Sequence, residues 1–218
     1  MTNPIPAELA PDLPSAAVLD RLVYLVGPAR GGTSVLHQAM NIHPQTLVLP
    51  NVTHYLQRVW RYHRKVHHRM LQEIIRMPTF WDDRIARTRL DERYPLFRQV
   101  TNRALDSHDL AEMYKLYPMM FALTPGFTKN LPDIACWHDK ENDWRFLAPL
   151  ARAFPSGKFI FVVRDPRSVS LSGGVRLAVK AGENTQYPPR AELITMALYW
   201  RLLVQRCLDI AGRYPDRS

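Results

Sequence analysis

The chain has few cysteines and no long apolar run, and both shortages limit what it can be. Its two cysteines, Cys136 and Cys207, lie far apart and outside any metal-ligand or redox spacing, which favours a reduced, intracellular protein. No apolar stretch approaches the ~20 residues that a membrane-spanning helix needs. The proline-rich N-terminal stretch carries acidic residues and no basic stretch before an apolar core, so it is not a signal peptide. We therefore expect a cytoplasmic protein.

Acidic residues are also in short supply. The chain has 29 Lys and Arg against 20 Asp and Glu, a formal net charge of +9 that favours an anionic ligand. No nucleic-acid-binding module accompanies this charge, so we expect no nucleic-acid partner. Its 218 residues are enough for one α/β domain. We expect a flexible leader over residues 1–20 and a single domain over 21–218.

The most informative segment is a glycine-rich turn that follows an apolar run. The sequence predicts a buried strand at Leu22 to Val26, the turn GPARGGTS at 27–34, and a helix from Thr33 to about Ile42. The glycines let the backbone approach a ligand closely, and the helix directs unpaired N–H groups and its positive dipole end at the same place. We expect the turn to hold an anion through Arg30, Gly31, Gly32, Thr33 and Ser34.

One position separates this turn from the P-loop that binds and hydrolyses ATP. Gly27 and Gly32 match the spacing G-x-x-x-x-G-K-[ST], but Thr33 stands where the lysine should be. The missing lysine argues against ordinary ATP hydrolysis and for a different phosphorylated donor. A P-loop kinase remains an alternative, but it would need a loop lysine and a carboxylate to hold magnesium.

A second segment, KFIFVVRDPRSVSLSGG at 158–174, repeats the strand-turn-helix order. Its apolar part, Lys158 to Val163, predicts a strand, and Asp165 and Pro166 suit the cap and first residue of the next helix. Arg164 then lies at the strand's carboxyl end, and Ser172 lies about two turns into the helix. Both can face one pocket and bind a second phosphate. The alternative for Arg164 is a structural ion pair.

Strands that alternate with helices predict the fold class. We expect a three-layer α/β domain whose central, mainly parallel sheet is flanked by helices and binds its ligand at the carboxyl ends of the strands. Further strands are predicted at Thr46 to Leu49 and Ile134 to Trp137. Further helices are predicted at Thr53 to Arg76, Asp91 to Leu105, Asp109 to Leu116, Asn142 to Phe154 and Ala191 to Ala211.

Taken together, the two segments resemble the cofactor loops of sulfotransferases that use 3′-phosphoadenosine 5′-phosphosulfate (PAPS). Between them, WHDKEND at 137–143 is similar to the family's W-x-E-K-T-P-x-N, with Lys140 at the lysine but Asp139 in place of Glu. The resemblance implies a P-loop NTPase-like domain, PAPS as donor and no metal. It also implies that Arg30 holds the 5′-phosphosulfate and that Arg164 and Ser172 hold the 3′-phosphate.

The same resemblance implies transfer of a sulfuryl group to a hydroxyl or amine of a small-molecule, carbohydrate or lipid acceptor. Arg30 would stabilise charge electrostatically. Lys140 would either reach the sulfate or pair with Glu141 or Asp143. We expect His54 to be the base that removes the acceptor's proton, and His138 is the second choice. The alternative for His54 is a structural role, capping or packing at the start of a helix.

Three further points follow from the sequence. Relatives continue past the end of this chain, so we expect it to be C-terminally incomplete, and a non-catalytic nucleotide-binding module is therefore the other alternative. The basic residues of 58–70 form either a solvated helical face or a surface for an acidic acceptor or a membrane. The oligomeric state is left open.

Overall fold

The structure is a computed structural model that describes residues 13–49, 95–107, 109–124, 127–182 and 188–217. Within these ranges four parallel strands form one sheet in the order β2-β3-β1-β4: β1 (Leu22–Val26), β2 (Thr46–Val48), β3 (Cys136–Glu141) and β4 (Lys158–Phe161). The described α-helices are α1 (Ala16–Leu19), α2 (Thr33–Ile42), α7 (Pro95–Ser107), α8 (Leu110–Ala122), α9 (Leu147–Ala153), α10 (Pro166–Lys180) and α11 (Arg190–Arg213). Short 3₁₀ turns are η3 (Leu131–Asp133), η4 (Trp144–Phe146) and η5 (Pro215–Arg217). This arrangement confirms the expected P-loop NTPase-like α/β fold.

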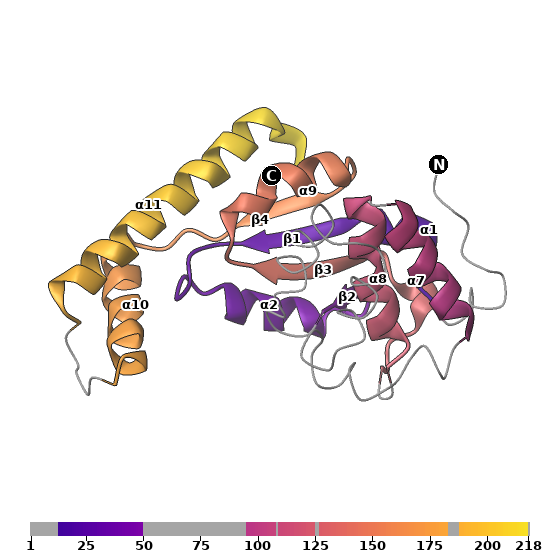
Figure 1. Ribbon diagram of the computed structural model, residues 1–218, viewed down its shortest axis with the longest axis horizontal. Helices are drawn as coiled ribbons and strands as arrows, with labels where there is room; N and C mark the ends of the chain where they lie inside the picture. Colours follow the sequence, from indigo (N-terminus) through magenta and orange to yellow (C-terminus); the bar gives the residue numbers. More distant parts are fainter. Residues whose placement is uncertain (1–12, 50–94, 108, 125–126, 183–187, 218) are drawn as a thin grey trace.

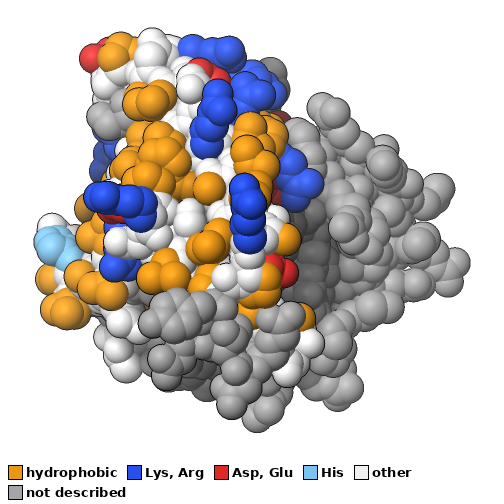
Figure 2. Space-filling view, turned by 90° about the vertical axis from the view of Figure 1, so that its left-hand side faces the viewer, with side chains coloured by type: hydrophobic (Ala, Val, Ile, Leu, Met, Phe, Trp, Pro, Cys, Tyr) orange, Lys and Arg blue, Asp and Glu red, His pale blue; other side chains and the backbone are white. Residues whose placement is uncertain are grey.

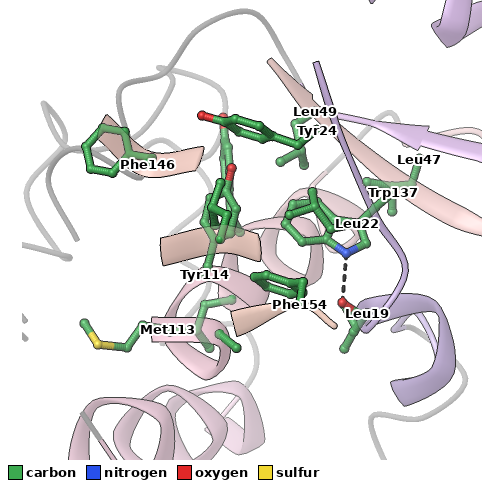
Figure 3. Packing of buried hydrophobic residues seen from close by; sticks show 14 of the residues in the cluster. Leu19, Leu22, Tyr24, Leu47, Leu49, Met113, Tyr114, Trp137, Phe146 and Phe154 are labelled. Atoms are coloured by element: carbon green, nitrogen blue, oxygen red, sulfur yellow. Dashed lines mark hydrogen bonds between the residues drawn. The ribbon is translucent and has the colours of Figure 1, made fainter. Parts of the chain in front are cut away.

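Helices cover both faces of the sheet. Successive residues of a strand point to opposite faces, so neighbouring residues of one strand pack against different helices. On one face Trp137 of β3 packs edge to face against Tyr114 of α8, with ring centroids 5.2 Å apart (Figure 3). The indole N–H of Trp137 donates to the carbonyl of Leu19 at 2.8 Å, which ties α1 to the same core. On the other face α2 contributes His37, whose ring lies 5.0 Å from that of His138 in β3. The result is three layers, with the main hydrophobic core on the side of α8.

Several elements lie where the sequence predicts them. The bounds of β1 and α2 agree with the prediction, and β4 ends at Phe161, two residues before the predicted end. Asp165 caps α10 as expected, because its carboxylate accepts from the backbone N–H groups of Arg167 at 2.8 Å and Ser168 at 3.2 Å. Helix α8 extends to Ala122, past its predicted end. The predicted helix from Thr53 to Arg76 lies outside the described residues.

The prediction for β3 was wrong in position. The strand runs from Cys136 to Glu141 rather than from Ile134 to Trp137, so it includes polar residues that lay outside the predicted strand. It occupies an interior place in the sheet, and Asp139 and Lys140 are only 6% and 3% exposed. The predicted helix after it also begins differently, with η4 preceding α9. Polar partners explain how the strand tolerates this burial: the hydroxyl of Tyr114 donates to Asp139, for example.

The expected leader needs correction for residues 13–20, its described part. Helix α1 begins after Ser15, whose hydroxyl accepts from the N–H of Val18 at 3.3 Å. Leu13 and Leu19 are each 3% exposed and belong to the hydrophobic core. Apolar side chains on either side of Pro14 thus hold this part against the domain rather than leaving it loose.

The strands direct their carboxyl ends toward one edge of the molecule. At that edge lie the turn between β1 and α2, the start of α10 and the projecting hairpin of α10 and α11 (Figure 1). Small residues allow the hairpin to close: a Cβ on Gly173 would lie 2.3 Å from Cε of Met196, and one on Gly174 would lie 2.8 Å from Cβ of Pro188. The fold therefore brings the two predicted ligand-binding segments to the same edge.

Gly27→Ala should destabilise the protein by about 1–3 kcal/mol, because the added methyl would lie 2.7 Å from the carbonyl oxygen of Val162 and 2.8 Å from Cγ2 of Thr33. Urea unfolding measures the free-energy change. Gly212→Ala is the matched control, since its methyl meets nothing within 4 Å and its helix should gain up to ~1 kcal/mol. Equal stability of the two variants would contradict the close approach at Gly27.

Candidate active site

The glycine turn adopts an unusual backbone conformation. Arg30 has φ of 70°, a left-handed value that a non-glycine residue seldom adopts, and Gly32 has φ of 99° as the N-cap of α2. The N–H of Gly31 donates to the carbonyl of Pro28 at 2.8 Å, so this amide closes the turn rather than pointing to a ligand. The amides of Gly32, Thr33 and Ser34 lie in the first turn of α2, where N–H groups have no partner within the helix. N–H groups in such a place are able to bind an anion.

The structure brings the two predicted segments into direct contact. The Arg164 guanidinium, through Nη1, donates to the carbonyl of Arg30 at 3.0 Å. The Arg30 guanidinium, through Nε, donates to Oγ of Ser172 in α10 at 2.9 Å. These pairs are separated by 134 and 142 residues in the sequence, so the fold alone creates the cluster. The described partner of Arg164 is a carbonyl and not a carboxylate, which disfavours the ion-pair alternative.

The side chain of Lys140 reaches the same turn from strand β3. Lys140 is the penultimate residue of β3, and its ammonium donates to Oγ of Ser34 at 3.0 Å. The carboxylate of Asp143, one of its alternative partners, instead accepts from the backbone and the guanidinium of Arg145. A buried cation thus lies close to the N-terminus of α2 and adds positive potential there.

Two neutral imidazoles lie beside Lys140, between α2 and β3. Burial and the charge of Lys140 lower the pKa of His37 to about 4. Burial, His37 and Lys140 lower the pKa of His138 to about 3, although its Nδ1 lies 3.0 Å from the Val23 carbonyl oxygen. His138 is 0% exposed, so it is poorly suited to take a proton from an acceptor. The second choice of base is therefore disfavoured.

Two predicted features are not described by the structure, and two described residues near the site were not predicted. His54 and the basic stretch 58–70 lie outside the described residues. Sequence reasoning missed two residues. One is His37, which lies in α2 just after the glycine turn. The other is Trp200 of α11, whose indole N–H donates to the carbonyl of Arg164 at 2.9 Å. Figure 2 shows the molecule from the side of the hairpin, where Lys and Arg side chains are far more prominent than Asp and Glu. This face suits an anionic ligand.

The fold is P-loop NTPase-like, and comparison with known proteins identifies the family. The family model described as the sulfotransferase family matches residues 23–217, nearly the whole chain. The chain belongs to the sulfotransferase family, and this membership supports a sulfotransferase function. No curated protein shows significant similarity to it.

The described residues contain neither a membrane-spanning helix nor a cluster of metal-ligand side chains. None of their helices is long and apolar enough to cross a membrane; the cytoplasmic location stays a prediction. The same residues contain no group of three or more His, Cys, Asp or Glu side chains arranged to hold a metal ion.

The free energy of unfolding should decrease as the pH is lowered, because the two buried imidazoles, His37 and His138, resist protonation in the folded state. A histidine whose pKa is lower in the folded than in the unfolded state stabilises fully above about pH 6.5, and this contribution is lost as pH falls toward about 4. His37 alone should account for about 3 kcal/mol over that range. Urea unfolding between pH 7.5 and pH 4 should therefore show a shallower pH dependence for a variant with His37→Gln and His138→Gln. Equal slopes for the variant and the wild type would contradict the assignment.

Proposed function

We propose that this protein binds PAPS and transfers its sulfuryl group to a hydroxyl or amine acceptor. The observation that carries the proposal is the contact between the two segments, in which Arg164 meets the Arg30 carbonyl and Arg30 meets Ser172. A donor with phosphates at both ends needs cationic and hydroxyl donors at two nearby places. These three residues and the start of α2 supply them.

The first place is the N-terminus of α2. Gly32 leaves room for close approach, since a Cβ on it would meet nothing within 4 Å and its φ suits glycine. The amides and hydroxyls of Thr33 and Ser34, with the guanidinium of Arg30, fit the 5′-phosphosulfate. Gly31 contributes by shaping the turn, because its N–H is already engaged with Pro28.

The second place is formed by Arg164 and Ser172. Arg164 is exposed and directed at the glycine turn, and Ser172 is half-buried on the facing side of α10. Both donate to phosphate oxygens readily, and they fit the 3′-phosphate. Arg30 belongs to the glycine turn that leads into the first place, and it contacts both members of the second place, Arg164 through its carbonyl and Ser172 through its guanidinium. We propose that it orients both ends of the donor.

Catalysis would then rest on position and charge. PAPS supplies an activated sulfuryl group, and the protein stabilises negative charge where it grows during transfer. Lys140 is the residue best placed for this, because its ammonium lies 3.0 Å from Oγ of Ser34 and is shielded from solvent. Arg30 stays fully charged and contributes electrostatically. The base remains His54 in this proposal, and the acceptor class remains a small molecule, carbohydrate or lipid.

Arg164→Ala should weaken binding of 3′-phosphoadenosine 5′-phosphate (PAP) by at least ~10-fold, since charge-assisted bonds to phosphate contribute about 1.5–3 kcal/mol. Isothermal titration calorimetry in EDTA measures the affinity and tests independence from magnesium. The matched control is Arg206→Ala, which removes one positive charge from α11 at a side chain whose described contacts are Asp209 and the ring of Trp144.

Four results would count against the proposal. Two concern binding: no binding of PAP to the wild-type protein in any buffer, and unchanged PAP affinity after Arg164→Ala. Magnesium-dependent turnover of ATP would favour the kinase alternative instead. Wild-type protein that binds PAP but transfers labelled sulfate to no acceptor in a broad screen would favour a non-catalytic binding module.

A further inference from the structure

We propose that Trp200 is a positioning residue that aims Arg164 at the 3′-phosphate of the donor. The inference rests on the proposed function and adds a residue to its site that no motif marks. Its basis is a hydrogen bond of 2.9 Å from the indole Nε1 of Trp200, in α11, to the backbone carbonyl of Arg164. The same Arg164 sends its guanidinium to the carbonyl of Arg30.

Three hydrogen bonds therefore run in series across the carboxyl edge of the sheet. They join Trp200 to Arg164, Arg164 to Arg30 and Arg30 to Ser172, at 2.9, 3.0 and 2.9 Å. Each joins a different pair of elements: α11 to the segment after β4, that segment to the glycine turn, and the turn to α10. Trp200 is the first member of this series and lies on the 24-residue helix α11.

The segment that carries Arg164 needs such support. Residues 162–165 lie between the end of β4 at Phe161 and the start of α10 at Pro166, and they form no regular structure. Val162 is held by its N–H, which donates to the carbonyl of Val26 at 2.9 Å, and Asp165 is held as the cap of α10. Arg164 lies between these two anchors, and the indole of Trp200 fixes its peptide directly.

Helix α11 is a firm support from which to do this. Met196 of α11 packs where Gly173 of α10 has no side chain, so the two helices lie in close contact. One residue before Trp200, the hydroxyl of Tyr199 donates to the carbonyl of Asn142 at 2.8 Å and fixes the helix to the end of β3. Beyond them Leu203 is fully buried in the core. Trp200 therefore acts from a held helix on an irregular segment.

The test compares two nucleotides that differ only in the 3′-phosphate, PAP and AMP. Trp200→Phe keeps an aromatic ring but removes the N–H, and it should weaken PAP binding about fivefold while changing AMP binding less than about twofold. Thr195→Val is the matched control, because it removes a side-chain donor to a backbone carbonyl, that of Ala191 at 2.8 Å, from an exposed position of the same helix. This control should keep the wild-type ratio of PAP to AMP affinity.

A double-mutant cycle separates positioning from a general structural effect. In the Arg164→Ala background, Trp200→Phe should have no further effect on PAP binding, since the side chain that it positions is absent. An equal loss of PAP and AMP affinity, or an additive loss in the double variant, would overturn the inference. A wild-type protein that does not prefer PAP over AMP would instead refute the proposed function itself.

A second measurement needs no substitution at Trp200. In the wild-type protein, the indole N–H resonance of Trp200 in ¹⁵N-resolved NMR spectra should shift when PAP is added and stay nearly unchanged when AMP is added. A resonance that responds equally to both nucleotides, or to neither while PAP binds, would overturn the positioning role. This measurement can be made even if the Trp200→Phe protein fails to fold.

Discussion

Arg30 forms hydrogen bonds with two residues, Arg164 and Ser172, and the organisation of the site depends on these two bonds. Its carbonyl accepts from Arg164 and its guanidinium donates to Ser172, while its own backbone is left-handed with φ of 70°. Such a conformation is unfavourable for a side-chain-bearing residue and persists where the surroundings hold it. The surroundings here are supplied by a segment more than a hundred positions later, so the turn and the second segment are fixed together.

Strand β3 carries polar residues into the interior of the sheet, and one of them, Lys140, contacts the start of α2 that follows the glycine turn. Asp139 and Lys140 are nearly buried in an interior strand, a costly arrangement unless each group has a partner. Tyr114 donates to Asp139 on the core side, and Lys140 reaches Ser34 on the side of α2. Burial here serves the site, because it places a cation under the helix N-terminus where an anion would bind.

The parts of the fold that could be predicted are those with a local signal. An apolar run followed by glycines was enough for β1 and α2, and an aspartate-proline pair was enough for the start of α10. Strand β3 was misplaced because its polar residues are satisfied by distant partners that the sequence does not reveal. Trp200 was missed for the same reason: an aromatic residue on a long amphipathic helix reads as core. The pairing of Arg164 with the glycine turn could be expected only from the edge rule for parallel sheets.

A crystal structure of the protein with PAP tests the central claim most directly. The account predicts the 5′-phosphate at the amides of Gly32 to Ser34 and the 3′-phosphate within hydrogen-bonding distance of Arg164 and Ser172, with Arg30 between them. A nucleotide bound elsewhere, or an Arg164 side chain directed away from the glycine turn with PAP in place, would contradict it.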